Sequence, residues 1–272
     1  MVIFNSQCLI STSMARIEVA ARSHPGLIRE NNEDNFFMCG VSMRADECNS
    51  GGLFKAINEN THQLYAVCDG MGGLDQGEKA SLLTVSDFDR LLPLGLRALP
   101  NELQRYINEI SASLQSSSGG ATSAGCTMTL IYMKNDRFIT ANIGDSRIYL
   151  KRKTLPLSLL TEDHSQAVWY MHHGILTPEE AETHESRNTL RRYIGAPDQE
   201  GKRPDISKVA HMKRDDIFLL CTDGLSNMLS VSDLNAELST DKSCADICRS
   251  LVTLALNHGA DDNITALVLR VC

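Results

Sequence analysis

The sequence predicts one α+β domain, with antiparallel strands at its centre and helices outside them. Short runs rich in β-branched and aromatic residues outnumber the helical patterns. Three of these runs follow one another through very short turns at 134–136 and 144–146, and such turns join antiparallel strands. No internal repeat and no linker divides the 272 residues, a length compatible with one β-rich domain.

Eight runs are predicted to be strands, and several are apolar throughout, which indicates burial on both faces. They are residues 17–22, 35–39, 63–68, 126–133, 137–143, 147–152, 217–221 and 264–271. Residues 42–62 and the small, polar stretch QSSSGGATSAG at 115–125 are predicted to be loops.

Four segments are predicted to be helical: 78–91, 101–114, a short helix that starts at 177, and 242–257. The third has the strongest local signal, because Thr177 can cap the helix and Glu180 can close a capping box. In the fourth, the apolar residues fall on one helical face and Gly259 lies just past its end.

Composition excludes several classes of function. An apolar fraction of 42% is enough for a sizeable core, and the net charge of −8 makes the chain a poor partner for nucleic acid or anionic membrane. No apolar run approaches the roughly 18 residues of a membrane span, and the start has no convincing signal peptide. The nine cysteines form no C-x-x-C pair. We therefore expect no zinc site and a reducing, cytoplasmic environment.

Acidic residues lie at the ends of several predicted strands, at Asp69, Asp145, Asp223 and Asp262, and Arg29, Glu33 and Asp34 precede another strand. Each acid alone could simply be part of a turn, since Asp-Gly is a common turn dipeptide. Together they are harder to explain in that way, because one sheet brings its strand ends close together and gathered carboxylates repel unless a cation neutralises them. An oxygen-only ligand set suits Mg²⁺ or Mn²⁺.

Other interpretations of these stretches fail on detail. Gly72 and Gly77 have the spacing of a P-loop, but Glu78 stands where the lysine is required. No G-x-G-x-x-G follows a strand, which argues against dinucleotide binding. Cys39 and Arg44 are one residue too close together for the Cys-x5-Arg loop of cysteine phosphatases. There is also no nucleophile elbow for a Ser-His-Asp hydrolase.

Seven segments, taken together, resemble the metal-dependent type 2C protein serine/threonine phosphatases in their bacterial form. They are SHPGLIRENNEDNFF (23–37), AVCDGMGGLDQGE (66–78), GCTMTL (125–130), ANIGDSRIYL (141–150), LTEDHS (160–165), LLCTDGLSNML (219–229) and DDNITALVL (261–269). They occur in the family's order, and the resemblance covers nearly everything from Ile17 to Val271.

The resemblance implies a four-layer α/β/β/α sandwich, in which two antiparallel sheets pack face to face with helices outside. It also implies two Mn²⁺ or Mg²⁺ ions at one edge of this sandwich. Asp69 is expected to bridge both ions, and the carbonyl of Gly70 to complete one site. Asp223 and Asp262 are expected to hold the other ion.

Three further roles follow from the same resemblance. Glu33 is expected to contact a metal-bound water, and Asp145 to form a weaker third metal site together with Asp223. Arg29 corresponds to the phosphate-binding arginine of the family, a role that suits a guanidinium because it can grip two oxygens at once.

The implied reaction is hydrolysis of phosphoserine and phosphothreonine in proteins by a water or hydroxide that bridges the two ions. Arg29 and the ions would neutralise the phosphoryl oxygens, and no covalent phospho-enzyme would form. One departure from the animal enzymes concerns the leaving group. Met71 stands where they have a histidine directly after the Asp-Gly, so the identity of the general acid stays open.

Residues 165–203 match the family's flap, a mobile segment beside the catalytic metals. Arg187, Arg191 and Arg192 lie close together within it. They could be a solvated basic face. Our hypothesis is that Arg191 and Arg192 help to bind the phosphoprotein substrate.

We expect residues 14–272 to form a single catalytic domain and residues 1–13 to be an extension without a family counterpart. Met14 is a candidate natural start. The expected protein is a cytoplasmic monomer that opposes a bacterial-type serine/threonine kinase. Two alternatives stay open, namely a catalytically weak regulator that binds phosphoproteins and a hydrolase of small phosphate esters.

Overall fold

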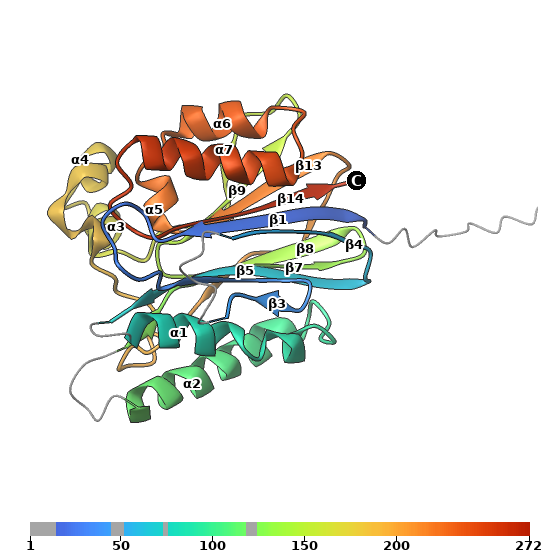
Figure 1. Ribbon diagram of the computed structural model, residues 1–272. Helices are drawn as coiled ribbons and strands as arrows, with labels where there is room; N and C mark the ends of the chain where they lie inside the picture. The colour runs from blue at the N-terminus through green and yellow to red at the C-terminus, as the bar shows by residue number, and fades with distance from the viewer. Residues whose placement is uncertain (1–14, 45–51, 73–75, 118–123) are drawn as a thin grey trace, which may run out of the picture.

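A computed structural model of the protein describes residues 15–44, 52–72, 76–117 and 124–272. Two antiparallel sheets lie face to face between two layers of helices (Figure 1). In the first sheet the strand order is β10 (Ser158–Leu159), β9 (Arg147–Arg152), β13 (Asp216–Cys221), β14 (Ile264–Val271), β1 (Ile17–His24) and β4 (Leu53–Asn58). The predicted α/β/β/α sandwich is confirmed.

The second sheet has the order β11 (Asp205–Ile206), β8 (Arg137–Ile143), β7 (Met128–Lys134), β5 (His62–Met71), β2 (Asp34–Met38) and β3 (Val41–Ser42). Two short strands lie off this path: β12 (Ala210–His211) pairs with β8, and β6 (Gly125–Cys126) pairs with β5.

Period-two alternation along the strands gives this sandwich three apolar cores. In β5, Tyr65 and Val67 belong to the core between the two sheets, whereas Leu64, Ala66 and Cys68 belong to the core under the helices of the second sheet. A third core lies between the first sheet and its own helices. Both faces of the central strands are therefore buried, which explains why these strands are apolar throughout.

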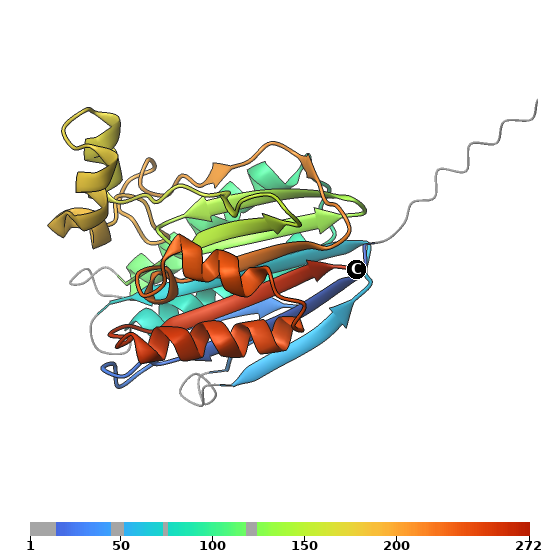
Figure 2. The ribbon, with the colours of Figure 1, turned by 90° about the horizontal axis from the view of Figure 1, so that it is seen from above.

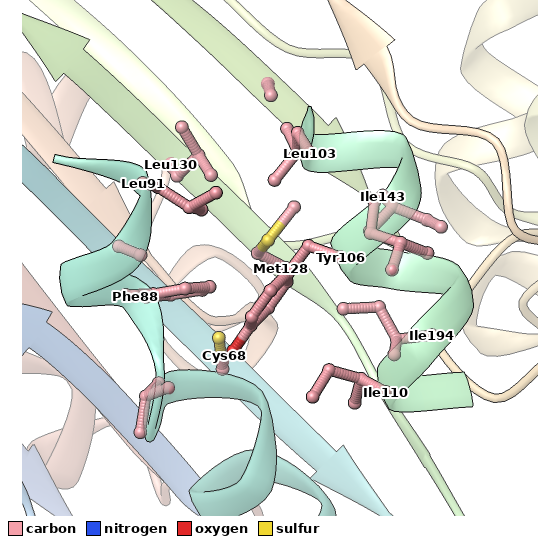
Figure 3. Packing of buried hydrophobic residues seen from close by; sticks show 14 of the residues in the cluster. Cys68, Phe88, Leu91, Leu103, Tyr106, Ile110, Met128, Leu130, Ile143 and Ile194 are labelled. Atoms are coloured by element: carbon pink, nitrogen blue, oxygen red, sulfur yellow. The ribbon is translucent and has the colours of Figure 1, made fainter. Parts of the chain in front are cut away.

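The helices that cover the second sheet are α1 (Gln76–Val85), the 3₁₀ turn η2 (Phe88–Leu91) and α2 (Leu99–Ser117). Figure 3 shows Phe88, Leu91, Leu103 and Tyr106 from these helices packed over Cys68 and Met128. Tyr106 is fully buried, and its hydroxyl donates to the carbonyl of Thr84 at 2.6 Å. This bond ties α2 to α1 and satisfies the one polar atom of the ring.

The first sheet is covered by α5 (Asp223–Ser226), α6 (Val231–Leu238) and α7 (Cys244–Asn257). Ser243 accepts a hydrogen bond from the backbone N–H of Asp246 and caps α7, which therefore starts two residues later than predicted. Gly259, at φ +108°, follows its end. This is a conformation that glycine adopts without strain.

A smaller helical unit, the flap, projects beyond the end of the sheets (Figure 2). It contains α3 (Gln166–His172), α4 (Pro178–Thr183) and the 3₁₀ turn η3 (Glu185–Asn188). The two ends of the unit are tied together, because the N–H of Gln166 donates to the carbonyl of Thr189 and the N–H of Arg191 donates to that of His164, both at 2.8 Å.

One loop prediction was wrong, and a second was wrong at its ends. Residues 42–62 contain β4, an edge strand paired with β1, and this edge position explains its weak apolar signal. Within 115–125, α2 continues to Ser117 and β6 begins at Gly125. The stretch between them, 118–123, lies outside the described residues, as do the predicted extension 1–13 and Met14. In the described part of the chain, no helix combines the length and apolarity needed to cross a membrane.

The capping box of α4 offers a test of the flap. The Thr177 hydroxyl accepts from the N–H of Glu180, and the Glu180 carboxylate accepts from the N–H of Thr177. Thr177→Ala should cost about 1 kcal/mol of local stability, which corresponds to roughly fivefold faster amide exchange across 178–183. Hydrogen exchange with mass spectrometry would measure this. Thr154→Ala, in an exposed turn, is the control and should leave exchange in α4 unchanged. Equal exchange in both variants would contradict the role of the cap.

Candidate metal centre

The core between the sheets turns polar at one end, without any break in the strand alternation. In β5, the face that carries Tyr65 and Val67 next carries Asp69. In β2, the face that carries Phe36 also carries Asp34, two residues earlier. Asp34 and Asp69 are direct partners in the antiparallel register of these strands. Two acids are thus placed side by side at the mouth of the sandwich.

The first sheet contributes hydroxyl groups to the same place. Thr222 follows the inward-facing Phe218 and Leu220 of β13, and Thr265 lies on the inward face of β14. Both hydroxyls donate to the same oxygen of Asp34, Thr222 at 2.8 Å and Thr265 at 2.7 Å. These two bonds connect the two sheets across the polar end of their core.

An open pocket of about 510 Å³ lies beside this network. Its walls bring together all the residues predicted to hold metal or phosphate around the two ions, from five separate parts of the chain: Arg29, Glu33, Asp69, Gly70, Asp145, Asp223 and Asp262. We call it the metal pocket. The flap adds Asn188, Leu190 and Tyr193 to its walls. The roles of these residues as ligands stay predictions, but their convergence is a property of the fold.

Asp69 itself is placed differently from the prediction. It does not follow a strand, because β5 continues through Met71 and pairs there with β6. Thr127 holds this part of the strand. Its hydroxyl accepts from the N–H of Asp69 at 3.0 Å, and its own N–H donates to the carbonyl of Asp69 at 2.8 Å. The backbone of Asp69 is therefore fixed before any ligand arrives.

Gly70 is required by a close approach of two chain segments. A Cβ at this position would lie 2.0 Å from the carbonyl oxygen of Gly77, at the start of α1. The N–H of Gly70 donates to the carbonyl of Glu33 at 3.1 Å. A side chain at this position would push α1 away from β2 and β5, whose ends form the pocket wall.

Arg29 is carried on a loop that is clamped by Asn263. The buried amide of Asn263 accepts from the N–H of Glu33 at 2.7 Å and donates to the carbonyls of Pro25 and Asn31, both at 2.9 Å. Arg29 lies between these anchor points and donates to the Asp262 carboxylate at 2.9 Å. One buried side chain thus sets the position of both Arg29 and Glu33.

Burial and mutual repulsion raise the pKa values of the pocket acids. Burial, followed by the charges of Asp34, Asp223 and Asp145, raises the pKa of Asp69 well above its usual value. Burial raises the pKa of Asp34 to about 8, although its threonine partners oppose this shift. Burial and the charge of Asp262 raise the pKa of Asp223 to about 6. The site therefore attracts positive charge, either protons or metal ions.

The residues present fit divalent metal ions of the oxygen-preferring kind. Among the described residues, no group of three or more His, Cys, Asp or Glu side chains is already placed to hold a metal ion. The acids instead surround an open pocket, and one oxygen each of Asp34 and Asp223 is buried without a hydrogen-bond partner. Open sites with a few carboxylates, a backbone carbonyl and room for water suit Mg²⁺ and Mn²⁺.

The flap arginines lie elsewhere. Arg192 donates to Asp205 at 2.8 Å, and the Arg191 guanidinium lies 4.7 Å above the ring of Trp169. Trp169 also stacks on His173, with ring centroids 3.8 Å apart. Arg191 and Arg192 line a separate cavity of about 160 Å³ and not the metal pocket. Their predicted role in substrate binding is untested by this geometry.

Sequence reasoning counted Asp34 among the gathered acids without a specific role, and it assigned no role to Thr127 or Asn263. For Asp34 a usable signal exists, because continuing the alternation of Phe36 and Met38 backwards along β2 places it on the inward face. Asn263 follows Asp262 directly in the predicted motif, but its contacts with Pro25 and Asn31 span more than 230 positions of sequence. No local pattern indicates such a clamp.

Comparison with known proteins settles the family. The family described as Protein phosphatase 2C matches residues 31–167, and the serine/threonine phosphatase stp of Listeria monocytogenes is 30% identical over 92% of this chain and 94% of its own. The chain belongs to the protein phosphatase 2C family. This confirms the family predicted from the seven segments and, with it, the prediction of a protein serine/threonine phosphatase.

Solved structures of this phosphatase family agree with the fold. The serine/threonine phosphatase of S. agalactiae superimposes with a TM-score of 0.79 at 28% identity, covering 94% of this chain and 100% of that one. The catalytic domain of the phosphatase PstP, in complex with two manganese ions, gives a TM-score of 0.74 at 28% identity, with 94% and 99% covered.

The raised pKa values predict how stability depends on pH. An acid whose pKa is higher in the folded state stabilises the protein below its unfolded pKa, and that contribution is lost as the pH rises through the folded value. Without metal, the melting temperature should therefore fall as the pH passes about 6 and then about 8, the values for Asp223 and Asp34. Mn²⁺ should restore the lost stability, because it should add about 2.7 kcal/mol to the free energy of unfolding when free ion exceeds Kd 100-fold.

The Mn²⁺ effect should be larger at about pH 8.5 than at about pH 5, because ions replace protons on the same carboxylates. Differential scanning calorimetry with and without EDTA measures both quantities. A Mn²⁺ increment that is equal at the two pH values would contradict this account of the pocket.

Proposed function

We propose that this phosphatase hydrolyses phosphoserine and phosphothreonine in proteins, using two Mn²⁺ or Mg²⁺ ions. The observation that carries the proposal is the metal pocket, where Arg29 lies among the converging carboxylates. A guanidinium beside an acid-lined, cation-attracting pocket suits a phosphate group, which needs positive charge on several oxygens at once.

In this proposal Asp69 would be a ligand of both ions, the Gly70 carbonyl would complete one site, and Asp223 and Asp262 would hold the other. When bound, the ions would neutralise phosphoryl charge and lower the pKa of a bridging water to near neutrality. The clamp on Asp69 and the close approach at Gly70 support these roles, because the Gly70 carbonyl belongs to fixed backbone and the Asp69 carboxylate is carried by it.

Glu33 and Asp145 would have weaker roles. Glu33 would hold a water beside the ions, and burial raises its pKa. Asp145, in the turn between β8 and β9, would form a third and weaker metal site with Asp223. The wall position of both carboxylates in the metal pocket supports this assignment.

Arg29 would orient the phosphate. A guanidinium has five N–H donors, and the bond to Asp262 uses one of them. The contact aims the group into the metal pocket, where its other donors can bind two phosphoryl oxygens.

Met71 also lines the pocket, but a thioether has no proton to give. The leaving oxygen would therefore take its proton from water or another group.

Replacement of Asp69 tests the metal mechanism. Asp69→Asn keeps the size of the side chain but removes the charge between the two ions, and kcat for a phosphothreonine peptide with Mn²⁺ should fall by about 10² or more. EDTA should abolish the activity of the unmodified protein. The matched control is Asp241→Asn, an exposed acid outside the pocket, which should keep full activity. Turnover that survives EDTA would overturn the proposal.

The predicted role of Arg191 and Arg192 has its own test. Replacing both with Ala should raise KM for a phosphoprotein several-fold but hardly change KM for p-nitrophenyl phosphate, because the two arginines do not line the metal pocket that would hold the small substrate. Since Arg192 also pairs with Asp205, Asp205→Ala is the control for loss of that ion pair, together with the contact of Asp205 to His164. Equal effects on both substrates would contradict substrate binding by these arginines.

The wider biological setting is also part of the proposal. Residues 14–272 would form one catalytic domain, with the flap at about 165–203, and would act as a monomer in the cytoplasm against a bacterial-type serine/threonine kinase. The unpaired cysteines among the described residues are consistent with a reducing compartment. A catalytically weak regulator is the less favoured alternative, because Asp69, Asp223 and Asp262 are all present. The other alternative is a hydrolase of small phosphate esters. A panel of such esters would separate the catalytically weak regulator from this hydrolase.

A further inference from the structure

A second depression adjoins the metal pocket on the flap side. It has a volume of about 630 Å³ and shares Asp145, Asn188 and Asp223 with the metal pocket, so the two are immediate neighbours. We call it the flap groove. One wall comes from α3 and α4, and the other comes from β10, the end of α5 and the start of α6.

Both walls of the flap groove carry apolar side chains among polar ones. Val168, Met171 and Ala181 line the flap side. Leu159, Leu229 and Val231 line the opposite side. Leu159 is 48% exposed and Val231 60% exposed, which is unusual for large apolar side chains that flank one groove. Such a paired apolar lining beside a catalytic pocket is typical of a surface that another molecule covers.

The charges around the groove restrict what can bind. Arg147 is neutralised by Asp163 at 2.6 Å, and Arg187 donates to the backbone carbonyl of Glu182. The acids in the lining outnumber these two arginines: Asp145, Glu162, Asp163, Glu182 and Asp223. Even with Asp145 and Asp223 balanced by metal ions, the groove does not favour an acidic ligand.

The groove is also held in shape at the base of the flap. The ring of the buried His164 accepts from the backbone N–H of Gly144 at 3.1 Å, and the backbone N–H of His164 donates to the carbonyl of Gly144 at 2.9 Å. Gly144 precedes Asp145 in the turn between β8 and β9, which joins the flap to the wall of the metal pocket. A ligand therefore meets a largely preformed surface, which lowers the ordering cost of binding.

From these observations we propose that the flap groove binds the polypeptide next to the phosphorylated residue and selects a large apolar side chain there, in a neutral or basic context. This inference rests on the proposed function and names a preference within its substrate class. Since the groove adjoins the metal pocket at Asp145, Asn188 and Asp223, an extended chain that places its phosphate on Arg29 would continue past these residues to the apolar side chains of the groove.

The test uses pairs of phosphothreonine peptides that differ only by Leu or Ser at one of the three positions on either side of the phosphate. With Mn²⁺, Leu should raise kcat/KM about tenfold over Ser at one or more positions. In Leu159→Ser/Val231→Ser, that ratio should fall below about twofold. Because the ratio compares two peptides in one variant, it cancels any loss of activity common to both.

Ile175→Ser/Val209→Ser is the matched control. These residues are 59% and 48% exposed but do not line the groove, so the control should keep the wild-type ratio. A wild-type ratio near one at every position, or the same fall in the control, would overturn the proposal while leaving the phosphatase activity intact. If the wild type hydrolyses neither peptide, the proposed function itself fails.

Charge and self-association give two more discriminating outcomes. The wild type should prefer Arg over Glu beside the apolar residue, and Glu182→Lys should narrow that preference.

A second copy of the chain could instead cover the groove. Sedimentation that shows a dimer dissociated by Leu159→Ser/Val231→Ser, with equal rates on Leu and Ser peptides, would overturn the substrate role.

Discussion

The structure is organised around the cost of bringing several carboxylates to one end of an apolar sandwich. Asp34 and Asp69 face each other across two paired strands, and Asp223 and Asp262 approach from the other sheet. Desolvation and like-charge repulsion both penalise this arrangement, as the raised pKa values of the acids show. Without cations the fold would have to hold protons at these positions. The same penalty becomes binding free energy once divalent ions replace those protons. In the proposed function, metal affinity, pH-dependent stability and phosphate attraction would thus be three consequences of one electrostatic arrangement.

Uncharged parts of the chain hold these acids in place. Thr222 and Thr265 both donate to Asp34 from the opposite sheet, so the two sheets cannot separate at this end without losing two buried hydrogen bonds. Asn263 does the same for the loop that carries Arg29. These side chains need neither charge nor contact with a phosphate to matter. They make the positions of the charged groups a property of the sandwich core, which is rigid, and not of the surface loops in which several of them lie.

Much of this could be predicted from the sequence, because the strands and the family motifs are local patterns. The eight predicted strands all exist, and the capping box at Thr177 forms as expected. The errors arise where the determining contact is distant in sequence. The edge strand β4 is specified by pairing with β1 more than by its own composition. Asp69 lies inside β5 because Gly125 and Cys126 extend the pairing, which the Asp-Gly dipeptide alone does not reveal. Likewise, the sequence places Arg191 and Arg192 together but cannot show that one stacks on Trp169 while the other pairs with Asp205.

Trp169 is the single tryptophan of the chain, and it lies in the flap between Arg191 and His173. Indole emission from this protein therefore originates in the flap and nowhere else in the 272 residues. A neighbouring imidazole quenches that emission more strongly when it is protonated, and a guanidinium over the ring shifts the energy of the excited state. The native chain thus contains its own optical reporter, which can follow flap rearrangements in stopped-flow experiments without a label and without disturbing the metal pocket.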